Sequence, residues 1–286
     1  MKTGTVLSIG HGKEYQIIGA LQGQSVYRAV DLRTGAGKCI KRYPFDTTYA
    51  DSMLPKFSRE VEMMDRLASC PNACIPEAIY RQSVEGYTVF PLLTGMNLEQ
   101  MLKRDGAVQA KQIVPILKQL EAALTYMHAL GISHRDIKPE NVFLSNRPRS
   151  RSKNLGNKNC TLLDFNIAEH PELPRLALPG YFVGTPAYAA PETVSGIHSL
   201  KPRVDVYSLS ASVFEAVTGS LPHPQTHFRD LQAAITSGSA PIARNVNPNV
   251  SQAVSDVLEK GLHKTPTNRY QSVAEFVEEF SVTATQ

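Results

Sequence analysis

Residues 134–141 read HRDIKPEN, and this stretch decides the fold. It places Asp136, Lys138 and Asn141 in one short turn, directly after a long amphipathic segment. An aspartate can accept a proton from a hydroxyl group, a nearby lysine can neutralise a transferring phosphoryl group, and an asparagine oxygen is a hard ligand suited to magnesium. The turn therefore predicts chemistry on phosphoryl groups.

A second acidic turn follows one strand hairpin later, where residues 162–166 read LLDFN. Its aspartate, Asp164, supplies a second hard ligand for a metal ion. Two positions further on stands Asn166, where a turn of this kind usually has glycine. Asparagine tolerates a positive φ better than most residues do. We therefore expect Asn166 to restrict flipping of the turn more than it harms catalysis.

The periodicity of apolar residues changes near residue 95. Upstream, short alternating stretches predict an antiparallel sheet that is interrupted by one helix. The predicted strands lie at 15–21, 25–31, 37–43, 77–82 and 86–92, and the predicted helix lies at 55–68. Downstream, apolar residues three or four apart predict a mostly helical region. The predicted helices lie at 112–130, 203–218, 227–236, 251–262 and 272–280.

The composition bounds the class of protein. The chain has 286 residues, of which 42% are hydrophobic, and its net charge of +4 does not by itself imply a nucleic-acid partner. Its apolar runs are shorter than the roughly 18 residues that span a bilayer. The first 14 residues lack the apolar core of a secretory signal. We expect a soluble, cytoplasmic protein whose four cysteines are reduced and do not bind zinc.

These motifs make the chain resemble a eukaryotic-type (Hanks-type) serine/threonine protein kinase catalytic domain over about residues 15–282. Four further pieces occur in the expected order: KCIK at 38–41, REVEMM at 59–64, DFN at 164–166 and GTPAYAAPE at 184–192. The resemblance implies an α+β, bilobal protein-kinase fold. A small antiparallel-sheet N-lobe with one helix would cover about 15–94, and a larger, mostly helical C-lobe about 95–282. Residues 1–14 would be an N-terminal extension.

The resemblance also implies catalytic roles. Lys41 would grip the α- and β-phosphates of ATP and pair with Glu60. Asp136 would orient the substrate hydroxyl and accept its proton, while Lys138 would hold the γ-phosphoryl group. The implied cofactors are ATP and Mg²⁺, with Mn²⁺ as an alternative ion. The implied metal ligands are Asn141 and Asp164.

The nucleotide site is the least typical part of the resemblance. In GALQGQSV at 19–26, Leu21 and Gln24 stand where the second and third glycines of the phosphate-covering loop usually lie. Glycine lets the backbone approach phosphates closely, so we expect weaker ATP affinity without loss of activity. Phe90 would be the gatekeeper, and Leu93 would offer backbone groups to adenine. The implied nucleotide-binding residues are Gly19, Gly23, Val26, Cys39, Lys41, Phe90, Leu93 and Phe143.

The segment after Asp164 suggests how activity is controlled. In the family, an arginine placed like Arg135 helps to bind a phosphate on this segment. Residues 166–184 contain no serine or threonine. The remaining candidate acceptors before the APE motif are Tyr181, Thr185 and Tyr188. We hypothesise that activity does not depend on a phosphoserine or phosphothreonine there, and that Glu169 or Glu172 pairs with Arg135 instead.

Two structural expectations also follow from the resemblance. Glu192 would pair with Arg269 near the C-terminus. Asp205 would be buried and would brace the catalytic turn through hydrogen bonds to its backbone.

The polar stretch at 146–160 is predicted to be an exposed loop or insertion. Its cationic residues could dock an acidic partner, nucleic acid or an anionic membrane surface, or the stretch could be a solvated, mobile loop. Ser150 and Ser152 are candidate autophosphorylation sites. The cationic residues are Arg147, Arg149, Arg151, Lys153 and Lys158.

Three functions are compatible with these residues. The favoured one is ATP- and Mg²⁺-dependent phosphorylation of serine and threonine in proteins, because Lys138 and the GTP before APE are typical of that class. A pseudokinase, which binds partners without turnover, is supported by the atypical glycine loop and by Asn166. Phosphorylation of a small molecule would use the same lobes, but GTPAYAAPE favours a polypeptide substrate.

Overall fold

The computed structural model describes all residues except 11, 23–24, 46–49, 147–154, 177–181, 198–201 and 240. The chain divides into two units. The first comprises Met1–Ser69 and Cys74–Thr94, and the second comprises Cys70–Ala73 and Gly95–Gln286. The last boundary between the two units along the chain follows Thr94, where the periodicity of the sequence changes.

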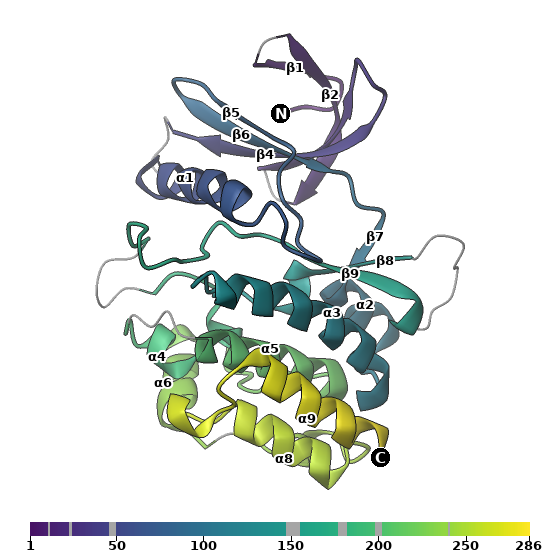
Figure 1. Ribbon diagram of the computed structural model, residues 1–286, viewed down its shortest axis with the longest axis vertical. Coiled ribbons are helices and arrows are strands. Elements are labelled where there is room, and N and C mark those ends of the chain that lie inside the picture. Colours follow the sequence, from purple (N-terminus) through teal and green to yellow (C-terminus); the bar gives the residue numbers. More distant parts are fainter. Residues whose placement is uncertain are drawn as a thin grey trace. The chain divides into compact units, whose positions relative to one another are not determined.

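The first unit is built on a six-stranded antiparallel sheet with one helix (Figure 1). The strands occur in the order β1-β2-β3-β4-β6-β5. Their bounds are β1 Val6–Ile9, β2 Lys13–Gln22, β3 Val26–Asp31, β4 Gly37–Pro44, β5 Ala78–Arg81 and β6 Glu85–Pro91, and the helix is α1 Ala50–Arg66. The sequence-based prediction of a small antiparallel sheet with one helix is confirmed.

Strand β1 lies in the segment that the sequence suggested was only an extension. It pairs with β2, and Ile9 at its end is 1% exposed. Gly10 follows with a φ of 63°, and a Cβ atom there would lie 2.4 Å from the ring of Tyr80. Because a side chain would not fit, glycine allows this turn to bring Ile9 into the core.

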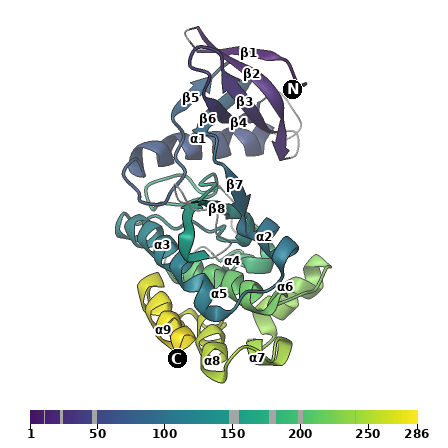
Figure 2. The same cartoon turned by 90° about the vertical axis from the view of Figure 1, so that its right-hand side faces the viewer.

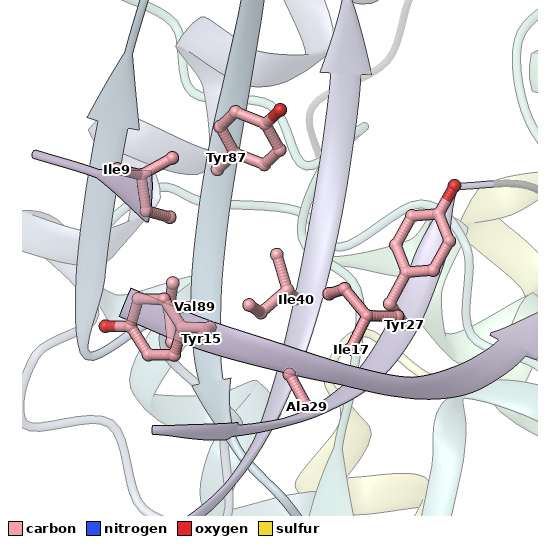
Figure 3. Close-up of a cluster of buried hydrophobic side chains, with 8 residues drawn as sticks. All are labelled: Ile9, Tyr15, Ile17, Tyr27, Ala29, Ile40, Tyr87 and Val89. Carbon is pink, nitrogen blue, oxygen red and sulfur yellow. The ribbon is translucent and has the colours of Figure 1, made fainter. Parts of the chain in front are cut away.

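The two faces of the sheet have different roles. One face carries a closely packed apolar cluster, which Figure 3 shows, consisting of Ile9, Tyr15, Ile17, Tyr27, Ala29, Ile40, Tyr87 and Val89. Residues directly opposite one another on neighbouring strands share a face. The register pairs Val26 with Lys41 and Lys41 with Thr88, so these three side chains lie on the other face. Helix α1 meets that face, because its Glu60 hydrogen-bonds Thr88.

The second unit is mostly helical and contains a small three-stranded antiparallel sheet (Figures 1 and 2). The strands are β7 Gly95–Asn97, β8 Val142–Asn146 and β9 Lys158–Leu162. The α-helices are α2 Leu98–Asp105, α3 Ala110–Ala129, α4 Pro191–Val194, α5 Arg203–Thr218, α6 Phe228–Ser237, α7 Ala243–Val246, α8 Gln252–Gly261 and α9 Val273–Thr285. The 3₁₀ turns are η1 Pro139–Asn141, η2 Leu155–Asn157, η3 Pro186–Tyr188 and η4 Pro266–Asn268. The prediction of a mostly helical second region is confirmed.

Helix α5 is buried on nearly all sides, which explains why its sequence shows no clear polar face. Its serine hydroxyls donate to backbone carbonyls one turn earlier, so each is buried with a partner. Gly261 of α8 packs where a Cβ atom would lie 2.1 Å from Ser210 Oγ. Helices α8 and α9 lie side by side at the C-terminal end (Figures 1 and 2).

The stretch at 146–160 was expected to be an exposed loop, but its residues 155–160 form regular structure. Residues 155–157 form η2 and residues 158–160 begin β9, with Leu155 and Cys160 buried. The sequence-based prediction missed these two buried residues because the stretch around them is polar. Of the five cationic residues, only Lys158 lies within the described part of the chain, and Ser150 and Ser152 lie outside it.

All four cysteines are free thiols. Within the described residues, no helix is both long enough and apolar enough to cross a membrane.

Candidate active site

The turn at 134–141 lies between α3 and β8, and Asp205 of α5 holds it through hydrogen bonds to its backbone. The backbone N–H groups of His134 and Arg135 donate to the two carboxylate oxygens of Asp205, at 2.9 and 2.8 Å. Arg135 has a φ of 68°, a conformation that non-glycine residues adopt rarely. The expected bracing of this turn by a buried aspartate is thus present.

Asp205 has a third partner that the sequence did not suggest. His128, near the end of α3, places Nε2 2.8 Å from Asp205 Oδ2. Burial works to raise the pKa of Asp205, but the hydrogen bond from His128 and the backbone donors outweigh it and hold the pKa below its usual value. Asp205 is therefore a buried carboxylate that depends on all three donors.

Asp136 is fixed by hydrogen bonds on both of its carboxylate oxygens. Thr185 Oγ1 donates to Oδ1 at 2.8 Å, and Asn141 Nδ2 donates to Oδ2 at 2.9 Å. Lys138 Nζ lies 3.0 Å from Oδ2 and also donates to Thr185 Oγ1 at 2.6 Å. Thr185 thus connects the GTP segment to the two charged residues of the turn.

The charge of Lys138 is supported by its neighbours. Burial lowers the pKa of Lys138, but the carboxylates of Asp136 and Glu140 raise it by more, so the net pKa lies above its usual value. Glu140 Oε2 is 3.3 Å from Lys138 Nζ. Lys138 is consequently a fixed cation beside the carboxylate of Asp136.

The turn that carries Asp164 is attached to the same loop through its preceding residue. Leu163 N–H donates to the carbonyl of Asn141 at 2.8 Å, and His134 Nε2 lies 3.1 Å from the carbonyl of Leu163. Phe165 stacks edge-on against His134, with ring centroids 5.2 Å apart. Asn141 and Asp164 are thus brought to neighbouring positions by backbone hydrogen bonds.

The expectation for Asn166 was wrong in its reasoning. Among the described residues, the non-glycine positions with positive φ are Asn72, Arg135 and Asp164, whose φ is 62°, and Asn166 is not one of them. The unusual backbone conformation falls on the aspartate itself. Asn166 is therefore not required to adopt a glycine-like conformation in this turn.

In the first unit, Lys41 and Glu60 form an ion pair. Lys41 Nζ lies 2.6 Å from Glu60 Oε1, and Glu60 Oε2 accepts from Thr88 Oγ1 at 2.9 Å. The Glu60 side chain is 3% exposed and that of Lys41 is 16% exposed. A buried glutamate with two partners orients the lysine so that its ammonium group is held on one face of the sheet.

The residues expected to contact the nucleotide in this unit follow the same face. Cys39 pairs with Phe90, and this pair lies two residues along the strands from the pair of Lys41 and Thr88, so all four side chains share that face with Val26. Burial raises the pKa of the Cys39 thiol to about 11.

The other expected nucleotide contacts are placed as follows. Gly19 lies in β2, opposite Arg28, and its Cβ position is open, so close packing does not demand glycine there. Leu93 lies two residues after the end of β6 and is half-buried. Phe143 belongs to the second unit, on β8, and is half-buried. Gly23 lies outside the described residues.

The expected pair of Glu192 and Arg269 is bidentate. Both guanidinium NH groups donate to the carboxylate at 2.8 Å, and the Arg269 side chain is fully buried. Nearby in the chain, Tyr188 donates to Glu215 at 2.6 Å. These bonds attach the GTPAYAAPE segment to the helical core of the second unit.

Comparison with known proteins defines the class. A model of the protein kinase domain matches residues 13–280. That is nearly the whole chain, and the chain belongs to the protein kinase domain family.

Among curated proteins, the chain is 27% identical over 281 residues to a probable serine/threonine-protein kinase of Clostridium acetobutylicum, covering 97% of this chain and 40% of that protein. It is 33% identical over 184 residues to the serine/threonine-protein kinase PknE of Mycobacterium tuberculosis, covering 64% and 30%. It is 27% identical over 261 residues to PrkC of Bacillus subtilis, covering 90% and 38%. The chain thus spans well under half the length of these curated relatives.

The family implies ATP and a divalent metal, and the residues of this chain fit both. Asn141 and Asp164 provide hard oxygen ligands, which magnesium-type ions prefer, and few protein ligands suffice when phosphates supply the others. The amide nitrogen of Asn141 is committed to Asp136, which leaves its oxygen as the atom available to a cation. Lys41 is a cation already oriented by Glu60.

Two polar residues of this arrangement were missed at the level of sequence. Thr88 could have been noticed, because a polar residue within the apolar strand YTVF needs a buried partner. His128 gave no local signal, since its partner Asp205 is 77 positions away.

Proposed function

We propose that the chain catalyses ATP-dependent phosphorylation of serine and threonine hydroxyls on protein substrates. The observation that carries this proposal is the arrangement around Asp136, whose two oxygens are held by Thr185, Asn141 and Lys138. A carboxylate fixed in this way can orient a substrate hydroxyl and accept its proton with little reorganisation.

The remaining residues have complementary roles in the proposal. Lys41, oriented by Glu60, binds the α- and β-phosphates of ATP. Lys138 stays charged because of its carboxylate neighbours, so it can stabilise the γ-phosphoryl group as negative charge spreads over its oxygens. The family relationship supports these assignments, since the curated relatives are named serine/threonine-protein kinases.

We further propose Mg²⁺ as the ion held by Asn141 and Asp164, with Mn²⁺ as a substitute. The metal, when bound, neutralises part of the negative charge of the phosphates. Asp164 and Asn141 fix the position of that charge relative to Asp136, because Leu163 joins the two segments through its backbone. The atypical glycine loop is expected to weaken ATP binding rather than to prevent transfer.

The Ser/Thr specificity rests on Thr185 and Lys138. Their 2.6 Å hydrogen bond connects the segment that lies before the APE motif with the lysine of the catalytic turn. This connection supports a polypeptide substrate aligned along GTPAYAAPE. Nothing observed in the described residues favours a module without turnover, because the charged participants are present and oriented.

The test is phosphotransfer from labelled ATP to a generic basic protein, with Asp136→Asn as the inactive variant. Asp256→Asn is the matched control, because Asp256 is an exposed carboxylate on α8. We expect transfer by the wild type and by Asp256→Asn, and at least about 1,000-fold less by Asp136→Asn, the combined loss of base and positioned carboxylate. Transfer to serine and threonine is checked by mass spectrometry. Equal transfer by all three proteins would reject the assignment of Asp136.

Two proposals concern the surroundings of the protein. We propose the basic stretch at 146–160 as a docking site for an acidic protein segment, supported by its sequence charge alone. Binding of a labelled poly-glutamate peptide, lost on replacing Arg149 and Arg151 by glutamate, would support it, and unchanged binding would reject it. A cytoplasmic location is proposed as well, and cell fractionation with antibodies against the chain tests it.

A further inference from the structure

The residue that meets Arg135 is Glu169, five positions after Asp164. Arg135 Nη1 lies 2.5 Å from Glu169 Oε2, and the two side chains are 9% and 3% exposed. Glu172, the alternative partner, has a side chain that is 72% exposed and lies near His170. The sequence left both glutamates open, and the structure selects Glu169.

The backbone of Glu169 is fixed to the same loop. Glu169 N–H donates to the carbonyl of Ser133, and Ser133 N–H donates to the carbonyl of Glu169, each at 2.9 Å. This isolated antiparallel bridge ties the segment after Asp164 to the segment before Asp136. The side-chain pair then lies directly beside the bridge.

Arg135 is buried against the carboxylate of Glu169. Its backbone N–H donates to Asp205, and its φ is 68°. Its Nε is buried without a hydrogen-bond partner in the described part of the chain. A buried guanidinium loses much of its stabilisation when the carboxylate paired with it is neutralised.

The sequence shows no serine or threonine between Asn166 and Gly184 whose modification could provide another anion. Glu169 places a carboxylate beside Arg135 as part of the chain itself, whereas a phosphate would be added only by modification.

We infer that Glu169 is a positioning residue for phosphoryl transfer, which fixes the Asp136 loop to the Asp164 turn through Arg135 and replaces an activating phosphate. The inference rests on the proposed kinase function. It predicts an enzyme that is active as synthesised, without phosphorylation of the segment that follows Asp164.

The first arm of the test compares protein treated with a phosphatase with protein incubated with ATP. Intact mass determines the number of phosphates in each sample, and initial rates are measured with labelled Mg-ATP. We expect the phosphate-free protein to retain at least half of the rate. A rate that falls at least tenfold on phosphatase treatment and returns with phosphate at Thr185 would overturn the inference.

The second arm uses Glu169→Gln, Arg135→Gln and the double variant, with Glu172→Gln as the matched control on the same segment. We expect kcat to fall roughly 10- to 100-fold in each single variant, and the double variant to be no slower than the slower single one. The KM for the protein substrate should stay within about threefold of the wild-type value, because neither residue is expected to contact substrate. Additive losses would mean that Arg135 and Glu169 act separately, and would overturn the inference.

The third arm needs no turnover. Stabilisation of the chain by Mg-ADP is followed as a shift in melting temperature, and we expect it to be smaller in Glu169→Gln than in Glu172→Gln. A wild-type protein that is as inactive as Asp136→Asn would reject the proposed function. If the wild type is active, an unchanged kcat and an unchanged Mg-ADP shift in Glu169→Gln would reject the role of Glu169 and leave the proposed function standing. If the wild type is inactive, an Mg-ADP shift in Glu169→Gln equal to that in Glu172→Gln would also reject the role of Glu169.

Discussion

Replacing Asp205 by asparagine tests how the turn at 134–141 is held. Asp205 accepts three hydrogen bonds: one from Arg135 N–H on Oδ1, and those of His134 N–H and His128 Nε2 on Oδ2. An asparagine has one oxygen and one NH₂ group, so in either orientation its NH₂ faces at least one of these donors. At least one buried N–H then loses its partner.

The size of the effect follows from these bonds. An unsatisfied buried donor costs about 1–3 kcal/mol, and the remaining bonds lose the strength that the charge gave them. We expect Asp205→Asn to lower the free energy of unfolding by about 3 kcal/mol. In a chain of this length that corresponds to a fall in melting temperature of roughly 5 °C. The exposed-site control, Asp256→Asn, should change stability by less than about 0.5 kcal/mol.

The dependence on pH gives a second check. The pKa of Asp205 is lowered in the folded state, so its carboxylate contributes stability above the unfolded-state pKa of about 3.9, and the contribution is lost as the pH falls through the folded-state value. The stability difference between the wild type and Asp205→Asn should be constant at neutral pH and narrow only below about pH 4. Circular dichroism melts across this range provide the measurement. A difference under 1 kcal/mol at pH 7 would refute the hydrogen-bond argument.

Three further changes test other parts of the structure. Lys41→Met should reduce phosphotransfer more than about 100-fold while the chain still folds, and retention of a tenth of the wild-type rate would contradict the role of this lysine. Glu192→Gln leaves the fully buried Arg269 without its anionic partner and should cost about 3 kcal/mol in unfolding experiments; a cost under 1 kcal/mol would show that the pair contributes little. Cys39, with a pKa of about 11, is about 0.1% thiolate at pH 8, so alkylation of this thiol should be at least 100-fold slower in the folded chain than in urea, and comparable rates would contradict its burial.

Much of the site could be predicted because its chemistry lies in short local motifs. HRDIKPEN places three functional residues within six positions, and strand alternation placed Lys41 on a half-buried sheet. The contacts that orient these residues could not be predicted in the same way. His128 and Asp205 are 77 positions apart, and no periodicity relates them. Strand β1 was also missed, because four residues, VLSI, are too short to show alternation.

The interpretation of the LLDFN turn changes with the backbone of Asp164. The sequence suggested that the third position of the turn required a glycine-like conformation and that Asn166 met this demand. The structure places the positive φ, 62°, at Asp164 instead. A left-handed conformation destabilises a non-glycine residue by roughly 1 kcal/mol, and here it occurs at Asp164, the residue expected to hold the metal.

A substitution at Asn166 therefore should act only through the unfolded chain and local flexibility. The backbone at position 166 does not need glycine, so Asn166→Gly relieves no strain in the folded chain and increases the backbone entropy of the unfolded chain. We therefore expect it to lower the free energy of unfolding by about 0.5–1 kcal/mol. Turnover should change less than threefold, because Asp164, Leu163 and their hydrogen bonds are unaffected. Steady-state kinetics and thermal melts on the same preparation separate the two quantities. A rise in kcat of tenfold or more in Asn166→Gly would mean that asparagine holds the turn away from its active geometry, and the argument from the backbone of Asp164 would then be wrong.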